Sequence, residues 1–121
     1  FKYKEKLNLD NINFSREWNW CEEQCELLMK FLRKKPQDFI LSNGKYFSIE
    51  KMIYYAFDFF NLNYKDYLHV KFFKFKKVKE NNRRSNYQKY FKRNNINFES
   101  KIFGKKLIHK MINFYLMKNK I

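Results

Sequence analysis

The chain has 121 residues, which suits one small domain or a piece of a larger one. It has only two glycines, which excludes a G-x-G-x-x-G dinucleotide loop, and no apolar run approaches the roughly 20 residues needed to span a bilayer. The net charge of +15 favours a nucleic acid or another polyanion as a partner, but the lysines are spread along the whole chain and an AT-rich coding bias accounts for them equally well. We therefore expect no membrane partner, and we rank nucleic-acid binding second among the candidate functions.

The first predicted elements are a strand and a helix. A loose apolar alternation from Lys6 to Phe14 predicts a short strand followed by a turn. Apolar residues spaced three or four apart predict a helix from Asn19 to Arg33. The apolar positions expected on the inner face of this helix are Cys21, Cys25, Leu28, Phe31 and Leu32.

A second strand and helix are predicted next. Asp38 to Ser42 is a short apolar run bounded by turn residues, which predicts a buried strand. Asn43 and Gly44 predict a turn. Ser48 is a suitable N-cap for a helix from Ile49 to Phe60.

The last part of the chain predicts one more strand and two helices. Aromatic and β-branched residues predict a strand from Tyr67 to Phe73, followed by a basic loop from Lys74 to Arg84. A short helix is predicted from Ser85 to Arg93, a loop from Asn94 to Ser100, and a final helix from about Phe103 to Lys118.

This alternation predicts an α/β fold that is mostly helical, with about three short strands. Three strands are few for an independent core, so we expect residues 1–121 to form a single segment of a larger α/β protein.

Cys21 and Cys25 are the only cysteines, and their spacing places both on one helix face. A metal site would need two more ligands, and the histidines, His69 and His109, are distant in sequence. We expect two core-facing thiols and no metal site. The charged N-terminal segment lacks the apolar core of a signal peptide, so we expect a cytoplasmic protein.

The run Leu7-Asn-Leu-Asp-Asn-Ile-Asn-Phe-Ser-Arg16-Glu17-Trp18 resembles a motif of GDP-mannose 4,6-dehydratases, Leu-x-Leu-Gly-Asn-Leu-Asp-Ala-Arg/Lys-Arg-Asp-Trp-Gly. These enzymes belong to the extended short-chain dehydrogenase/reductase superfamily of NAD-dependent epimerases and dehydratases. The similarity continues at Pro36-Gln-Asp-Phe39, at Leu62-Asn-Tyr-Lys-Asp-Tyr67 and at Leu107-Ile-His-Lys-Met-Ile112, in the order of the family.

The resemblance implies that the chain is the C-terminal, substrate-binding part of a Rossmann-type enzyme whose cofactor-binding half is absent. The parent would be a lyase that converts GDP-D-mannose to GDP-4-keto-6-deoxy-D-mannose, with NADP as a transient hydride carrier, and would be a homo-oligomer. The Gly-rich loop, the hydroxyl proton acceptor and the Tyr-x-x-x-Lys pair of the family lie upstream of the matched part. The segment would bind the GDP-sugar and would not catalyse the reaction alone.

Arg16 is the first candidate site residue, because the family arginine at this position contacts the diphosphate of the nucleotide sugar. A guanidinium group grips phosphate through two hydrogen bonds and a permanent charge. The alternative is an arginine at the mouth of a helix, paired with Glu17 or Glu22. Trp18 is expected to pack the helix entry against the sheet.

Lys74 is the second candidate for the diphosphate, at a position where the family has arginine. Lysine keeps the charge and loses the planar fork. The family proline and glutamate that follow are Phe75 and Lys77 here. The alternative is a solvated basic loop, and the two interpretations have equal weight.

Two other functions remain open. The first is a stand-alone basic module for nucleic acid or another polyanion, in which aromatic and basic residues from His69 to Lys79 stack bases. The second is a degenerate remnant without activity, which the substitutions between Lys74 and Lys77 favour.

Overall fold

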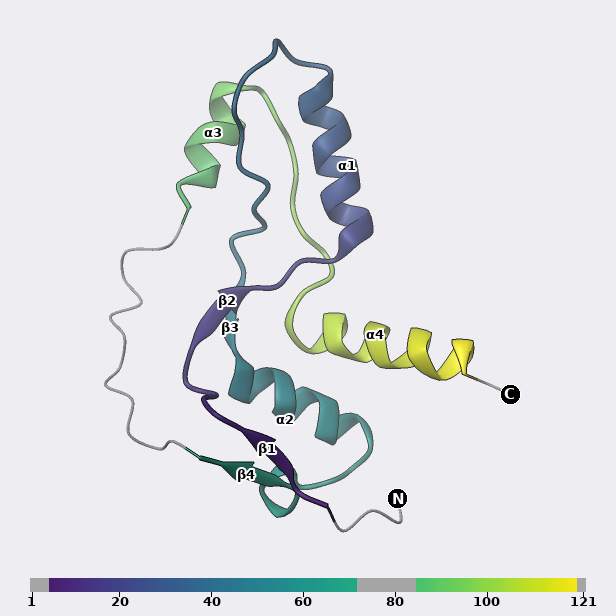
Figure 1. Cartoon of the computed structure of the whole chain (residues 1–121). Coiled ribbons are helices and arrows are strands. Elements are labelled where there is room, and N and C mark those ends of the chain that lie inside the picture. Colours follow the sequence, from purple (N-terminus) through teal and green to yellow (C-terminus); the bar gives the residue numbers. More distant parts are fainter. Residues whose placement is uncertain (1–4, 72–84, 120–121) are drawn as a thin grey trace.

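The computed structural model describes residues 5–71 and 85–119, and this part of the chain has an α/β fold, as predicted (Figure 1). The strands have three residues each, and α4 is the longest helix among the described residues. In chain order, the elements are β1 (Leu7–Leu9), β2 (Ser15–Glu17), α1 (Cys21–Leu32), β3 (Tyr46–Ser48), α2 (Ile49–Phe59), the 3-10 helix η1 (Tyr64–Asp66), β4 (Leu68–Val70), α3 (Tyr87–Arg93) and α4 (Gly104–Lys118).

The strands form two separate pairs. β1 and β4 are parallel, with Leu7 opposite Leu68. β2 and β3 are antiparallel, with Arg16 opposite Phe47. Parallel strands need a long crossover connection, and the chain between β1 and β4 provides one that contains α1 and α2.

One apolar cluster lies between α1, α3 and the segment that follows each of them. Its buried members are Leu27, Phe31, Phe91 and Ile96, and Leu27 is fully buried. Phe31 stacks on Phe39 at 4.6 Å and contacts Phe91 edge-on at 5.9 Å. These contacts stabilise the end of the molecule that Figure 1 draws at the top.

A second apolar cluster lies at the opposite end, where α2 packs on β1 and β4 (Figure 1). Its buried members are Ile12, Ile53 and Val70. Ser48 caps α2 as predicted, because its Oγ accepts a hydrogen bond from the backbone N–H of Lys51 at 3.1 Å.

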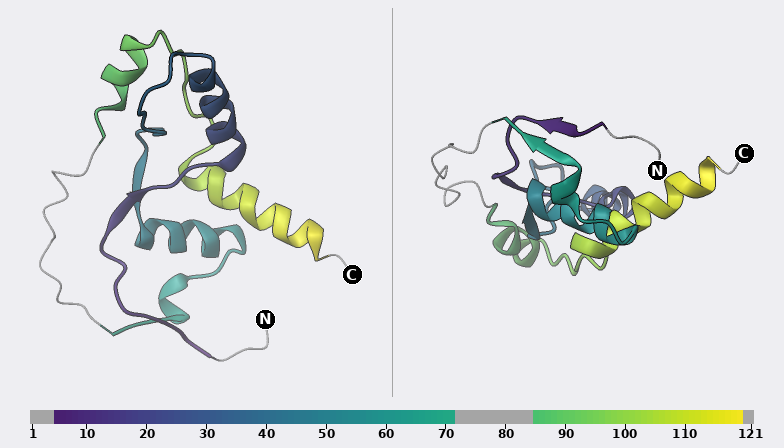
Figure 2. Two further views of the ribbon diagram at one scale, coloured as in Figure 1. Left: turned by 45° about the horizontal axis from the view of Figure 1, so that its top comes forward. Right: turned by 90° about the horizontal axis from the view of Figure 1, so that it is seen from below.

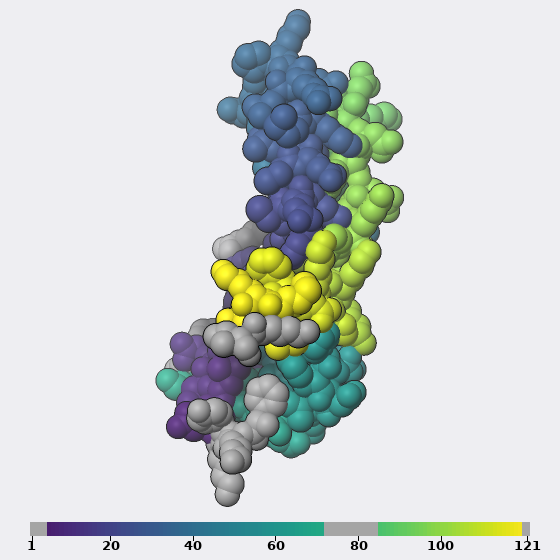
Figure 3. All heavy atoms as spheres, turned by 90° about the vertical axis from the view of Figure 1, so that its right-hand side faces the viewer, coloured from purple at the N-terminus to yellow at the C-terminus, as the bar shows by residue number. Residues whose placement is uncertain are grey.

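α4 packs on α2 through its first half only. Leu107 and Ile108 are buried, and Lys105 pairs with Asp58 at 2.7 Å. The second half of α4 extends beyond α2, as the left view of Figure 2 shows. Phe114 and Tyr115 there are 60% and 66% exposed. Figure 3 shows this helix between the two ends of the molecule.

A polar network lies between α1 and the segment that leads into α4, and Glu23 lies at its centre. Glu23 is buried in the first turn of α1, and its Oε2 accepts a hydrogen bond from Ser100 Oγ at 2.6 Å. Its Oε1 accepts from the backbone N–H groups of Lys101 at 2.8 Å and Ile102 at 3.0 Å. One carboxylate therefore attaches α1 to the segment that leads into α4.

Two predictions about the first half of the chain are wrong. Residues 38–42 form no strand, because this run packs the Phe39 ring on the first apolar cluster and leaves Ile40 47% exposed. Cys21 and Cys25 are exposed rather than core-facing, because α1 turns a different face toward the core. That face consists of Glu23, Leu27 and Phe31.

The other helices agree with the predictions to within a few residues at each end. α2, α3 and α4 lie where the sequence predicted helices, and residues 94–100 form the predicted loop. β4 lies in the first part of the strand predicted from Tyr67 to Phe73, whose last two residues fall outside the described residues. The loop predicted from Lys74 to Arg84 falls entirely outside the described residues.

Candidate functional site

Arg16 lies in β2, and its side chain is exposed. Its Nη1 donates a hydrogen bond to the carbonyl oxygen of Ser15 at 2.9 Å, and the guanidinium carbon lies 5.0 Å from the centre of the Phe14 ring. α1 begins only at Cys21, so the expectation that Arg16 sits at the mouth of a helix is wrong. The guanidinium group instead projects from a short antiparallel ribbon.

Glu17 and Trp18 fix the backbone that carries Arg16. The carboxylate of Glu17 accepts hydrogen bonds from Ser42 Oγ at 2.7 Å and from the backbone N–H of Asn43. Trp18 Nε1 donates to the carbonyl oxygen of Phe47 at 3.2 Å, which agrees with the expected packing role. Both side chains therefore hold the ribbon rather than face a ligand.

The ion pair considered for Arg16 does not form with either predicted partner. The Glu17 carboxylate accepts its hydrogen bonds from Ser42 and Asn43. Glu22 accepts a hydrogen bond from Trp20 Nε1 at 2.9 Å and pairs with Lys110 at 3.6 Å. Both contacts lower the pKa of the Glu22 carboxyl group, the Trp20 hydrogen bond more strongly. Among residues 5–71 and 85–119, no carboxylate lies within ion-pair distance of Arg16. Its charge is thus available to an anion from outside this part of the chain.

The turn at Asn43 and Gly44 lies next to the same ribbon and is joined to it through hydrogen bonds of Asn43 to Glu17 and Trp18. Asn43 Oδ1 accepts a hydrogen bond from the N–H of Lys45 at 2.8 Å, which confirms the predicted turn. Gly44 has a φ of 67°, and a Cβ there would lie 2.6 Å from Cζ of Tyr87. Both the backbone angle and the close ring require glycine.

A hollow of about 520 Å³ lies beside this turn and is lined partly by Asn43, Lys45 and Lys92. The ammonium group of Lys45 lies 4.9 Å from the centre of the Phe103 ring. Arg16 does not line the hollow, so the structure does not combine it with these lysines in one pocket. Lys74, the second predicted site residue, lies outside the described residues.

A Tyr-x-x-x-Lys spacing occurs at Tyr67 and Lys71, but the structure does not make it a helical pair. The two residues lie on either side of β4. Tyr67 packs on the Phe57 ring at 5.6 Å, and Lys71 lies 3.9 Å from Asp10. These contacts give the two residues no shared site.

The described glycines and acidic, histidine and cysteine residues can be checked for a cofactor or metal site. Gly44 and Gly104 belong to a turn and to the start of α4, so they do not form a dinucleotide-binding loop. In the described ranges, no group of three or more His, Cys, Asp or Glu residues could hold a metal ion. None of the described helices combines the length and apolar character needed to cross a membrane.

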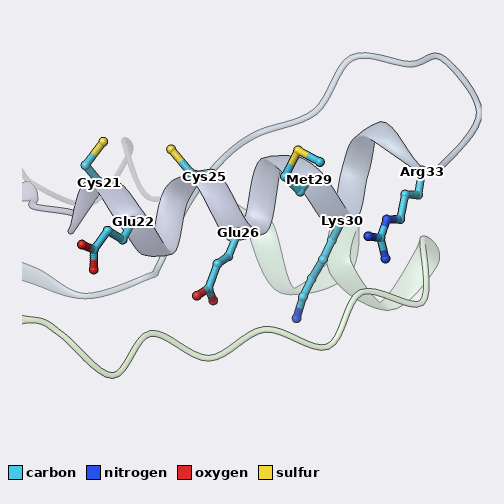
Figure 4. Close-up of a pocket in the computed structure, with 7 residues that line it drawn as sticks. All are labelled: Cys21, Glu22, Cys25, Glu26, Met29, Lys30 and Arg33. Atoms are coloured by element: carbon cyan, nitrogen blue, oxygen red, sulfur yellow. The ribbon is translucent and has the colours of Figure 1, made fainter.

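The exposed face of α1 carries two thiols and a thioether (Figure 4). A groove of about 730 Å³ runs along it, with Cys21, Cys25 and Met29 among its lining residues. A side-chain hydrogen bond with Cys21 raises the pKa of the Cys25 thiol. The two thiols therefore interact with each other.

The comparisons with known proteins give a distant match. A stretch of 66 residues is 29% identical to GDP-mannose 4,6 dehydratase 2 of Arabidopsis thaliana. It covers 54% of this chain and 18% of that protein. No family model matches the chain. The chain thus has a distant relationship to a dehydratase and corresponds to a small part of it.

Proposed function

We propose that this chain is the C-terminal, sugar-nucleotide-binding part of a dehydratase that acts on a GDP-sugar and has an extended short-chain dehydrogenase fold. The observation that supports this most is Arg16. It is exposed on the β2–β3 ribbon, and no described carboxylate neutralises it. The distant similarity to a GDP-mannose 4,6 dehydratase supports the choice of ligand.

The chemistry of the site fits a diphosphate. A guanidinium group binds phosphate oxygens through two parallel hydrogen bonds, and it stays charged at all physiological pH values. The Glu17 and Trp18 contacts hold the β2 backbone in place. Only the Arg16 side chain therefore needs to change conformation when a ligand binds. Lys74 remains the proposed second contact.

Catalysis is assigned to the parent enzyme and not to this chain. The proposed parent is a homo-oligomeric lyase that uses NADP, and its cofactor-binding half would contact this segment. The exposed apolar side chains of the second half of α4, such as Phe114, support a larger packing partner.

A binding experiment on the 121-residue chain tests the proposal. NMR or calorimetric titration should show that the chain binds GDP-mannose in preference to inorganic phosphate. Arg16→Ala should weaken GDP-mannose binding by about 10- to 100-fold, the loss expected for a charge-assisted hydrogen-bonded pair. Arg33→Ala is the matched control, because Arg33 is exposed at the other end of α1.

Equal weakening in both variants would contradict the Arg16 assignment, because it would indicate a general charge effect. The net charge of +15 favours a polyanion-binding module as the second candidate. That function would appear as binding of generic single-stranded nucleic acid with an affinity that falls steeply with salt.

A further inference from the structure

Three sulfur atoms are aligned on the exposed face of α1. Cys21, Cys25 and Met29 are spaced four residues apart, and four residues correspond to about 6 Å along a helix. Figure 4 shows all three sulfur atoms on one side of the helix, with the carboxylates of Glu22 and Glu26 on the other. The three side chains line one groove, and Cys21 and Cys25 are close enough along the helix for one small ion to lie between their sulfur atoms, whereas Met29 lies about 12 Å from Cys21.

Packing among the described residues does not explain this alignment. Both cysteines are exposed, and Met29 is 54% exposed. None of the three belongs to either apolar cluster. Cysteine and methionine are usually buried in folded proteins, so an exposed row of them is unusual.

We propose that Cys21 and Cys25 bind one monovalent thiophilic metal ion, such as Cu(I), between their sulfur atoms. Thiolate and thioether ligands select soft ions of this class. Two metal–sulfur bonds form, the two thiol protons pass to solvent, and neither the metal nor the sulfur changes oxidation state. This inference is independent of the proposed sugar-nucleotide function.

The number of donors selects a monovalent ion over zinc. A structural zinc site needs four ligands in a tetrahedral arrangement, and the described residues offer no group of three His, Cys, Asp or Glu side chains. A soft monovalent ion is satisfied by two or three sulfur donors. The two cysteines therefore suffice without histidine.

The charge of the chain permits such a complex. Two thiolates and a monovalent cation carry one net negative charge, which suits a chain with a net charge of +15. Of the two carboxylates, Glu22 is already occupied by Trp20 and Lys110. Glu26 is the remaining negative charge, and it points to the opposite side of the helix (Figure 4).

Anaerobic titration of Cu(I) against a chromogenic chelator tests the proposal. We expect one Cu(I) per chain, sulfur-to-copper absorption in the ultraviolet, and a higher melting temperature of the loaded chain. Because the sequence has only two cysteines, the absorption reports on this pair alone. Cys21→Ser and Cys25→Ser should each weaken binding by at least about 100-fold.

Met29→Leu and Met111→Leu, at two exposed methionines, should leave binding unchanged. All four substitutions lie at exposed positions, and circular dichroism verifies that the variants fold. Undiminished Cu(I) affinity in Cys25→Ser would overturn the proposal. A stoichiometry of one ion per two chains with dimer formation would also overturn it, because the ion would then bridge separate molecules.

Discussion

Glu23 offers the sharpest test of how this molecule is held together. Glu23→Ala removes a buried carboxylate that accepts three hydrogen bonds, from Ser100 Oγ and from the backbone N–H groups of Lys101 and Ile102. The Ser100 hydroxyl is buried and loses its partner, at a cost of about 1–3 kcal/mol. The two N–H groups are only part-buried and regain water in part.

We therefore expect Glu23→Ala to lower the free energy of unfolding by about 3 kcal/mol. For a chain of this size, this corresponds to a melting temperature about 10 °C lower. Glu23→Gln should cost less, because the amide oxygen still accepts the backbone hydrogen bonds.

Urea and thermal denaturation followed by circular dichroism measure the effect. Glu26→Ala is the matched control, since Glu26 is an exposed carboxylate on the same helix and its loss should change stability by no more than about 0.5 kcal/mol. If Glu23→Ala and Glu26→Ala destabilise the chain equally, the carboxylate does not join α1 to the segment before α4. In that case, the reasoning about the polar network is wrong.

Three other predictions concern single contacts. Gly44→Ala should lower the free energy of unfolding by about 1–3 kcal/mol, because it places a Cβ at a φ of 67° and 2.6 Å from a carbon of Tyr87; an unchanged urea midpoint would show that the turn relaxes freely. Leu27→Ala should cost about 2–5 kcal/mol, because Leu27 is fully buried, and a loss below about 1 kcal/mol would place it outside the core. Trp20→Phe should raise the pKa of Glu22 toward its ordinary value of 4.5, because the indole hydrogen bond is the main cause of the lowered pKa; carboxyl NMR titration measures it, and an unshifted titration would contradict that cause. The stabilisation from this hydrogen bond exists above the ordinary pKa and disappears as the pH falls through the lowered one.

The sequence predicted local features of the fold well and the partners of each face poorly. α2 was predictable because Ser48 caps it and its apolar residues follow one stripe. α1 was harder, since its apolar residues lie on two faces of the helix. One face carries Cys21, Cys25 and Leu32, and the other carries Leu27 and Phe31. The contacts with Phe91 and Ile96 select the second face, and these residues are distant in the chain.

The buried carboxylate of Glu23 illustrates a second limit of the sequence. Glu23 lies four residues before Leu27 and eight before Phe31, so it shares their face. A pattern of this kind normally places a carboxylate in solvent, because burying an unpaired charge is costly. The hydrogen-bond donors that offset this cost come from the segment before α4, far along the chain. Arg16 was identified by resemblance, but its position in a strand depended on the pairing of β2 with β3.

The two apolar clusters are interleaved along the chain, and this has a consequence for the order of folding. β1 belongs to one end of the molecule, α1 to the other, α2 and β4 to the first again, and α3 to the second (Figure 1). Neither cluster can therefore form from one continuous piece of chain. Each core gains its contacts only after a long loop has closed, and such non-local closure slows folding. The two apolar clusters should accordingly fold together rather than one after the other.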